Sequence, residues 1–283
     1  MQRKNKIRVI VNADDLGISL EVNSQIEECI KQGVVSSTTL LVNAPAFEDG
    51  VRIAKQYTNV SVGIHLNLVE FAPLTNTDVF RDFGIVGSDG NFIEGAIFIA
   101  DCNNERLKRA VFEEWDAQLC KFKSFGINPT HIDSHQHTHT IIGLQEALCE
   151  VMKKHNITKV RRKMVPSIRL MLKGRQQTTA VKLDKSKAVV SKKRNVFYRR
   201  FHVFVAKYYG NKWNRQMAKH FVMTDSFYAF RHFYSNLNDL RIRNTIELMC
   251  HPGHTAYENE SNELINNQSW LSGEYKLISY GEL

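Results

Sequence analysis

The sequence has no regular cysteine pattern. Its cysteines are odd in number and scattered, and none forms a CxxC pair; they are Cys29, Cys102, Cys120, Cys149 and Cys250. This argues for reduced thiols and against a disulfide framework or a cysteine-based zinc site. Neither a GxGxxG nor a GxxxxGK[ST] motif is present. Nucleotide binding of those two kinds therefore has no support.

Long apolar runs are also missing. No stretch reaches the roughly 18 apolar residues that a transmembrane helix needs. The start, "MQRKNKIRVIVNADD", is basic and then apolar, like a signal peptide. However, its apolar run is short, ends in two aspartates and has no small-residue cleavage site. We therefore predict a first β-strand in a cytoplasmic protein, in a chain of 283 residues that is long enough to bury a substantial core.

Acidic residues are almost absent from one segment. Between Arg161 and His220 there are 18 lysines and arginines and a single acid, Asp184, so this window carries +17 and the rest of the chain −8. Residues 166–219 are predicted to be an insertion, a helical pair with aromatic residues among the cations. The usual explanation is a solvated basic face, and the alternatives are peripheral binding to anionic lipid or an anionic sugar. No nucleic-acid partner is expected, because no reading motif is present.

Short β-branched runs alternate with helix-like stretches along the chain. The runs cover residues 7–11, 36–43, 60–69, 130–138, 158–165, 220–227 and 245–253, and the helical stretches cover 20–32, 46–56, 105–125 and 141–155. This alternation predicts βα units and a parallel sheet. Seven strands favour a distorted TIM-barrel-like (β/α) barrel, formed by a single domain over residues 1–283. Residues 71–104 show no clear period and are predicted to be a long loop.

The first predicted strand ends in carboxylates. In α/β barrels the chemistry lies at the carboxyl ends of the strands, and here "VIVNADDLGIS" delivers Asn12, Asp14 and Asp15. Since neighbours in an extended chain point to opposite sides, one aspartate could bind a metal while the other acts as a base. Gly17 then allows a tight turn and Ser19 could cap the next helix. The alternative is a helix-capping aspartate pair.

Two further strands place histidines at the same edge. "GIHLNL" carries His65 and, on the same face, Asn67, and "ELMCHPGH" delivers His251 at a sharp Pro-Gly stop. A lone histidine in an apolar strand is usually a hydrogen-bonded core residue. Several polar strand ends in one layout favour a shared site.

The stretch "HIDSHQHTH" has polar residues at every odd position. These are His131, Asp133, His135, His137 and His139. In a strand they would share one face, but at roughly 3.3 Å per residue the two ends lie about 26 Å apart. One ion with bonds of about 2.0–2.2 Å cannot collect them all. Only one residue, or two neighbours, can ligate a metal unless the chain turns. The alternative is a solvated histidine-rich edge.

Together, "NADDLG", "SSTTLLVN", "GIHLNL", "THIDSHQHTH" and "ELMCHPG" resemble the motifs of the YdjC-like carbohydrate deacetylase family, which includes ChbG-type chitooligosaccharide deacetylases. They occur in family order between residues 8 and 254, and residues 166–219 give no match. The resemblance implies a distorted barrel and one divalent metal ion held by Asp15, His65 and His135. The metal stays open among zinc, magnesium, manganese, cobalt and nickel.

The resemblance also implies an activity, the removal of an N-acetyl group from an amino-sugar-containing carbohydrate. Asp14 matches the base of that reaction, and His251 lies where a general acid is expected. Asp133 would fix the tautomer of a ligand imidazole.

The remaining candidates and alternatives are open. Asn12, Asn67 and His137 are candidates for contacts to substrate or ligands, and His139 has no assigned role. The alternatives are another metal-dependent amidohydrolase or phosphoesterase, because "HQH" resembles a His-x-His pair, and a peripheral membrane or glycan-binding protein. The sugar, its chain length and a homodimer are left open.

Overall fold

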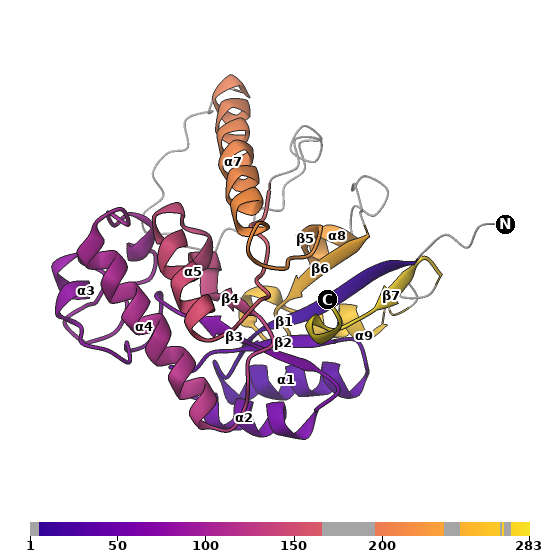
Figure 1. Ribbon diagram of the computed structural model, residues 1–283. Coiled ribbons are helices and arrows are strands. Elements are labelled where there is room, and N and C mark those ends of the chain that lie inside the picture. Colours follow the sequence, from indigo (N-terminus) through magenta and orange to yellow (C-terminus); the bar gives the residue numbers. More distant parts are fainter. Residues whose placement is uncertain (1–5, 166–195, 235–243, 267, 269–272) are drawn as a thin grey trace.

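A curled parallel sheet lies at the centre of the molecule (Figure 1). The computed structural model describes residues 6–165, 196–234, 244–266, 268 and 273–283. The strands are β1 (Ile7–Leu16), β2 (Ser37–Leu40), β3 (Ser61–Leu66), β4 (Ile132–Ser134), β5 (Ser226–Ala229), β6 (Thr245–Cys250) and β7 (Tyr275–Leu277). Their order is β4-β3-β2-β1-β6-β5, β7 also pairs with β1, and each of these pairs is parallel.

Helices flank the outside of this sheet (Figure 1). They are α1 (Leu20–Lys31), α2 (Phe47–Gln56), α3 (Asp78–Asp82), α4 (Glu105–Ser124), α5 (Gln145–Lys154), α7 (Val196–Met217), α8 (Phe230–Tyr234) and α9 (Glu260–Asn266). Ser19 caps α1 by accepting a hydrogen bond from the backbone of Val22, as the sequence predicts. In α4, apolar residues three or four positions apart are buried, which is the pattern of a helix packed on a core. Parallel strands and flanking helices confirm the predicted distorted α/β barrel.

The predicted strand at 158–165 is reduced to isolated bridges. Lys159 bridges to Val222 and Val160 to Ile132, so the sheet path continues for only two residues. Beyond them the backbone of Lys163 exchanges hydrogen bonds with the Asn214 side chain of α7, which removes the need for a strand partner. The predicted strand at 220–227 is displaced toward the C-terminus, and β7 was not predicted.

The segment 71–104 is more ordered than a plain loop. It contains α3 and a short 3₁₀ helix, Ala96–Phe98. Its beginning is attached to α4 because the buried carboxylate of Glu114 accepts hydrogen bonds from the backbone of Leu74 and from the backbone and hydroxyl of Thr75.

Less than half of the predicted basic insertion is described. Residues 166–195 lie outside the described residues, and the remainder forms the single helix α7, which extends away from the sheet (Figure 1). Its end packs on the body through buried Trp213 and Met217, whereas Phe204 and Tyr208 are exposed. None of the described helices combines the length and apolarity needed to cross a membrane.

Candidate metal centre and active site

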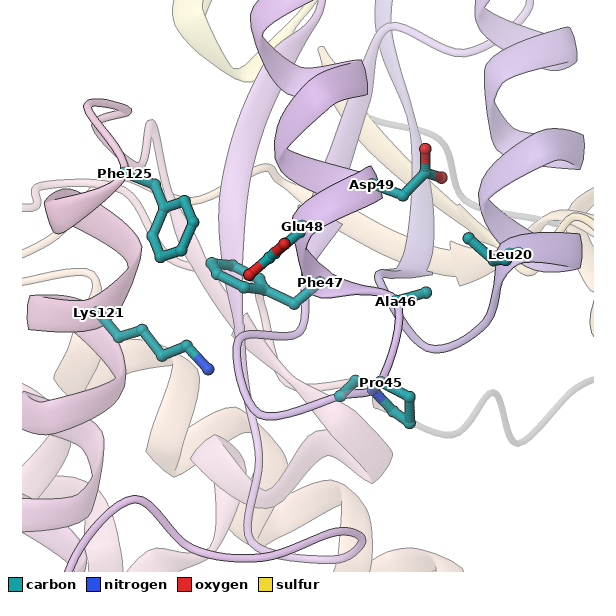
Figure 2. Close-up of a pocket in the computed structure, with 9 residues that line it drawn as sticks. Leu20, Pro45, Ala46, Phe47, Glu48, Asp49, Lys121 and Phe125 are labelled. Carbon is teal, nitrogen blue, oxygen red and sulfur yellow. The ribbon is translucent and has the colours of Figure 1, made fainter.

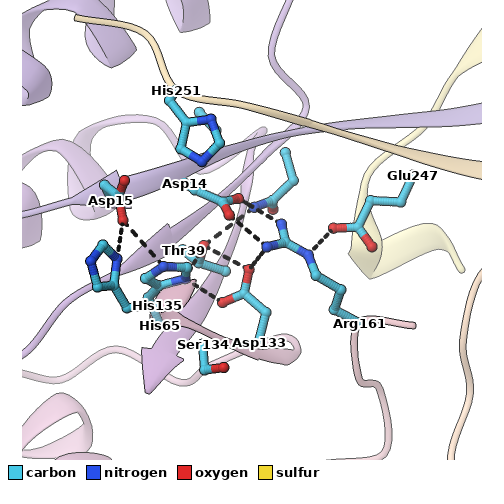
Figure 3. A network of polar contacts seen from close by, with 12 residues as sticks. Asp14, Asp15, Thr39, His65, Asp133, Ser134, His135, Arg161, Glu247 and His251 are labelled. Carbon is cyan, nitrogen blue, oxygen red and sulfur yellow. Dashed lines mark hydrogen bonds and ion pairs between the residues drawn. The ribbon is translucent and has the colours of Figure 1, made fainter. Parts of the chain in front are cut away.

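Three strands bring one aspartate and two histidines together at their carboxyl ends (Figure 3). Asp15 ends β1, His65 lies in β3, and His135 follows β4. Asp15 Oδ1 lies 2.9 Å from His135 Nδ1 and 3.2 Å from His65 Nε2. One ligand atom from each residue lies within 4.8 Å of the others, and all three residues are buried. The predicted donor set is therefore assembled in space.

The backbone of β1 explains how Asp14 and Asp15 both reach this site. The register between β1 and β2 shifts between Ala13 and Leu16, and Asp15 has φ 68°. The bulge departs from the extended geometry on which the expectation of oppositely directed carboxylates was based. Asp14 and Asp15 each offer an atom within 4.8 Å of His65. Gly17 follows with φ 94°, and a Cβ there would lie 2.9 Å from the Leu41 carbonyl oxygen.

The histidine-rich stretch turns instead of continuing as a strand. β4 ends at Ser134, and the next residues form a 3₁₀ segment in which Gln136 and His137 have positive φ. Only His135 of the four histidines joins the Asp–His–His cluster. The other three histidines make ring contacts outside this cluster. His131 stacks on Tyr280 with ring centroids 3.6 Å apart.

His139 is buried and His137 is half-buried, and both lie beside the site. His139 Nδ1 lies 2.5 Å from the Ser134 hydroxyl, and its Nε2 faces the backbone oxygen of Arg161. The His137 ring packs edge-on against Phe227, and its Nδ1 has no hydrogen-bond partner in the described structure. Burial lowers the pKa of His137 to about 3, so its ring is neutral at ordinary pH.

Asp133 supports the imidazole of His65 from behind. Its Oδ1 lies 2.6 Å from His65 Nδ1, and its Oδ2 accepts from the Thr39 hydroxyl at 3.0 Å. With Nδ1 directed to Asp133, the Nε2 atom of His65 faces Asp15. This is the contact that orients a metal-ligating imidazole.

Arg161 is the main residue that the sequence interpretation missed. Its guanidinium is fully buried and lies 2.6 Å from Asp14, 2.7 Å from Asp133 and 2.7 Å from Glu247 (Figure 3). Glu247 also accepts a hydrogen bond from the Tyr280 hydroxyl. The sequence placed Arg161 at the start of a basic window. Its three acceptors lie far away along the chain, so the sequence carried no local signal for its burial.

Arg161 controls the ionisation of Asp14. Burial alone disfavours the carboxylate, but Arg161 outweighs it and holds the pKa of Asp14 well below its usual range. Asn12 adds a donor, since its amide nitrogen lies 2.9 Å from Asp14 Oδ1. Asp14 is therefore ionised at neutral pH.

The Asp–His–His cluster favours positive charge. Burial disfavours a charged imidazole, but Asp133 and Asp15 raise the pKa of His65 to about 9. Asp15, followed by Glu70, likewise outweighs burial and raises the pKa of His135 to about 10. The negative potential of these carboxylates, which favours a positive charge here, is what a cation-binding site requires.

Glu70 stands at the open side of this cluster. Its Oε1 lies 3.7 Å from His135 Nε2, and its side chain is 38% exposed. Asn67 shapes the turn that carries it: the Asn67 amide donates to the Glu70 carbonyl at 2.7 Å and its oxygen accepts from the Val69 backbone. Asn67 thus lies in the loop after β3 and holds the turn that positions Glu70. The sequence analysis did not single out Glu70.

His251 lies on the other side, close to Asp14 (Figure 3). It follows β6, and its ring stacks on Tyr257 with centroids 4.2 Å apart and planes at 11°. Burial lowers the pKa of His251 below its usual value. Its backbone N–H donates to Glu260 at 2.5 Å.

The donor chemistry fits one divalent metal at Asp15, His65 and His135. One carboxylate oxygen and two imidazole nitrogens leave coordination positions open, as a catalytic site needs. A second described group, Asp14 with His65 and Asp133, already holds the Arg161 guanidinium. Arg161 therefore leaves the Asp15 set as the one prepared for an ion.

Two other features lie apart from this centre. A pocket of about 430 Å³ opens between α2 and α4, and it is lined by Leu20, Ala44, Pro45, Ala46, Phe47, Glu48, Asp49, Lys121 and Phe125 (Figure 2). None of these residues belongs to the Asp–His–His cluster. A third group, Asp116 with Cys120 and His155, lies between α4 and the end of α5. Lys154 already pairs with Asp116 at 2.8 Å, so it is an ion-pair network.

Fold and site together define a parallel α/β barrel-like protein with a buried Asp–His–His set at its strand ends. The YdjC-like protein family model matches residues 8–279. The chain belongs to this family.

Curated relatives are similar to part of the chain. A carbohydrate deacetylase of Clostridium beijerinckii is 40% identical over 151 residues, which are 53% of this chain and 58% of that protein. A carbohydrate deacetylase of Geobacillus stearothermophilus is 41% identical over 130 residues, 46% of this chain and 49% of that protein. The matched region thus spans only about half the length of these relatives.

A solved structure has the same fold. It is that of an Enterococcus faecalis V583 protein named for cellobiose-phosphate cleavage, with a TM-score of 0.68 and 21% identity over 99% of both chains. At this identity the likeness concerns the fold alone.

Proposed function

We propose that the protein is a metal-dependent hydrolase that removes the N-acetyl group of an amino-sugar-containing carbohydrate, releasing acetate and a free amine. One observation carries this: Asp15, His65 and His135 converge beside an ionised Asp14 in a YdjC-like chain. The relatives named carbohydrate deacetylase support the substrate class.

Asp15, His65 and His135 would hold the metal, with Asp133 and Thr39 behind His65. When bound, the metal supplies a Lewis acid that acidifies a water and polarises the amide carbonyl. Glu70 at the open side is placed to contact substrate or to steady His135.

Asp14 acts as the base in this proposal. Arg161 and Asn12 orient its carboxylate and keep it in the anionic form that accepts a proton. It takes the proton of the water that attacks the acetyl carbon. His251, from the opposite side, donates a proton to the leaving amine nitrogen.

An acetate-release assay tests the proposal most directly. N-acetylglucosamine oligomers, N-acetylated sugar phosphates and lipid-linked sugars are offered with zinc, magnesium, manganese, cobalt or nickel. Metal-dependent acetate release in the wild type, absent in His135→Ala, is the expected outcome. Phosphate release without acetate would instead establish the phosphoesterase alternative.

The exposed part of α7 favours a second role, peripheral binding to an anionic membrane surface. Phe204 is 64% and Tyr208 54% exposed, and Lys207 and Lys212 form no ion pair with an acid among the described residues. The helix has no acidic residue and stands away from the sheet (Figure 1). A basic helix with aromatic side chains suits the interface of anionic lipid.

Vesicle flotation checks this role. We expect the intact protein to float with vesicles that contain phosphatidylserine and to stay in solution with neutral vesicles. Replacing both Phe204 and Tyr208 by alanine should abolish flotation, whereas Phe98→Ala, at an exposed aromatic on the 71–104 segment, should not. Absence of flotation by the wild type rules this role out.

A further inference from the structure

Glu260 is a buried acid that the proposed chemistry does not yet use. It is 2% exposed at the start of α9. Its Oε2 accepts the His251 backbone N–H at 2.5 Å and lies 3.8 Å from His251 Nδ1. Among the described residues no lysine or arginine forms an ion pair with it. Burying a carboxylate without a cation is costly, so its position beside His251 requires a physical reason.

The segment from Gly253 to Glu260 surrounds the His251 ring. Tyr257 covers its face in a parallel stack. Gly253 has φ 79°, and a Cβ there would lie 2.8 Å from the Gln25 side chain, so the turn after His251 is fixed against α1. Tyr257 thus holds the ring plane while Glu260 stands at the Nδ1 edge, which leaves Nε2 directed away from Glu260.

A general acid needs a proton that burial tends to remove. Burial lowers the pKa of the His251 imidazole and raises the pKa of Glu260 to about 7. An anion beside an imidazolium stabilises both charges in a buried setting. Because the Glu260 carboxylate and His251 Nδ1 lie 3.8 Å apart, the charged form of each group would favour the charged form of the other.

We propose that Glu260 is the positioning residue of His251: its carboxylate, 3.8 Å from Nδ1, forms an ion pair with the protonated ring and so directs Nε2–H to the leaving amine. This inference rests on the proposed function. In the step, the Nε2–H bond breaks and an N–H bond forms on the amine as the C–N bond breaks. Nδ1 keeps its proton, and Glu260 neither gives nor takes a proton in this step.

Other charged groups act on the pair from every side. For His251 these are Asp14, Asp15, His254 and Arg161, and for Glu260 they are Arg231, Glu263 and Asp14. All of these groups remain in the Glu260 variants described below. A change in the pKa of His251 in those variants therefore comes from Glu260 itself.

The test compares Glu260→Gln with Glu263→Gln. Glutamine keeps an oxygen for the His251 backbone N–H and removes only the charge, while Glu263 lies one turn further along the same helix and is 43% exposed. The imidazole of His251, assigned by His251→Gln, is titrated by NMR in the full chain. We expect its pKa to fall by about one unit or more in Glu260→Gln and to stay unchanged in Glu263→Gln. An unchanged titration in Glu260→Gln overturns the inference.

The kinetic measurement separates this inference from the proposed function. In Glu260→Gln kcat should fall about tenfold, with its alkaline limb displaced to lower pH and KM preserved. A wild-type protein that releases no acetate would refute the proposed function, and the NMR titration would still decide on Glu260. If Glu260→Gln does not fold, Glu260→Asp, which withdraws the carboxylate by one methylene, must lower the pKa of His251, or the inference fails.

Discussion

Two adjacent aspartates have different environments because of one irregularity in β1. Asp15 faces two imidazoles, whereas Asp14 is held by Arg161. The bulge, with Asp15 at φ 68°, lets two neighbouring residues of the same strand occupy these two environments. The division gives each carboxylate its own testable role.

Asp14→Asn should abolish turnover and spare the metal. We expect acetate release to fall at least about 100-fold, since a general base is lost, while metal affinity changes only a few-fold because the three donors are untouched. Turnover and metal content by mass spectrometry check both parts. A variant with more than a tenth of the wild-type rate contradicts the assignment of the base.

His135→Ala and His139→Ala should differ in kind. His135 is a proposed ligand, so its loss should remove the metal. His139 is only a structural neighbour, bonded to Ser134. Its loss should leave metal content intact and lower the free energy of unfolding by about 2 kcal/mol. Metal analysis and urea unfolding distinguish them, and equal metal loss in both variants would refute the division.

At this scale the sequence shows which side chains supply the donors but not how they are tied together. Spacing alone excludes a metal site made only from "HIDSHQHTH". It still allows one residue of this stretch, such as His135, to be a ligand. Arg161 could not be predicted, because its acceptors lie 28, 86 and 147 positions away and only the fold brings them to it. A positive residue in a basic window is ordinarily solvated, whereas this one is fully buried.

At the scale of elements, side chains replace strand pairing in several places. The side chain of Asn214 in α7 forms hydrogen bonds with the backbone N–H and C=O of Lys163, within the predicted strand at 158–165. The carboxylate of Glu114 in α4 accepts hydrogen bonds from the backbone N–H groups of Leu74 and Thr75. Local patterns identify β1, β3 and the long helices, but they do not reveal such contacts between distant elements. The three-residue strand β7 has too little pattern to be predicted.

Glu114→Ala should loosen the segment that begins at Leu74. The backbone N–H groups of Leu74 and Thr75 would lose a charged acceptor, so we expect the free energy of unfolding to fall by about 3 kcal/mol. Glu113→Ala is the matched control, because Glu113 is an adjacent, half-exposed glutamate whose one ion pair among the described residues is with Arg109. Urea unfolding of both variants measures the difference; equal midpoints would show that Glu114 does not anchor this segment.

At the scale of the molecule, the proposed metal should act as a stabilising ligand. A metal at 1,000 times its Kd adds about 4 kcal/mol to the free energy of unfolding, which corresponds to a Tm higher by about 10 °C for a chain of this size. Chelation should remove that increment, and added metal should restore it. His135→Ala should show no response to chelator or metal, and a wild-type Tm that ignores both would contradict the proposed centre.

The contacts of Arg161 also bear on the order in which the chain becomes complete. Asp14 belongs to the first strand, Asp133 to the fourth and Glu247 to the sixth, so the guanidinium is fully compensated only after nearly all of the chain is present. A nascent chain that ends before β6 holds Arg161 without one of its acids. The ion pairs around Asp14 and Arg161 are thus complete only after β6 has docked. A chain truncated before β6 is expected to lack an active site even where its first half has folded.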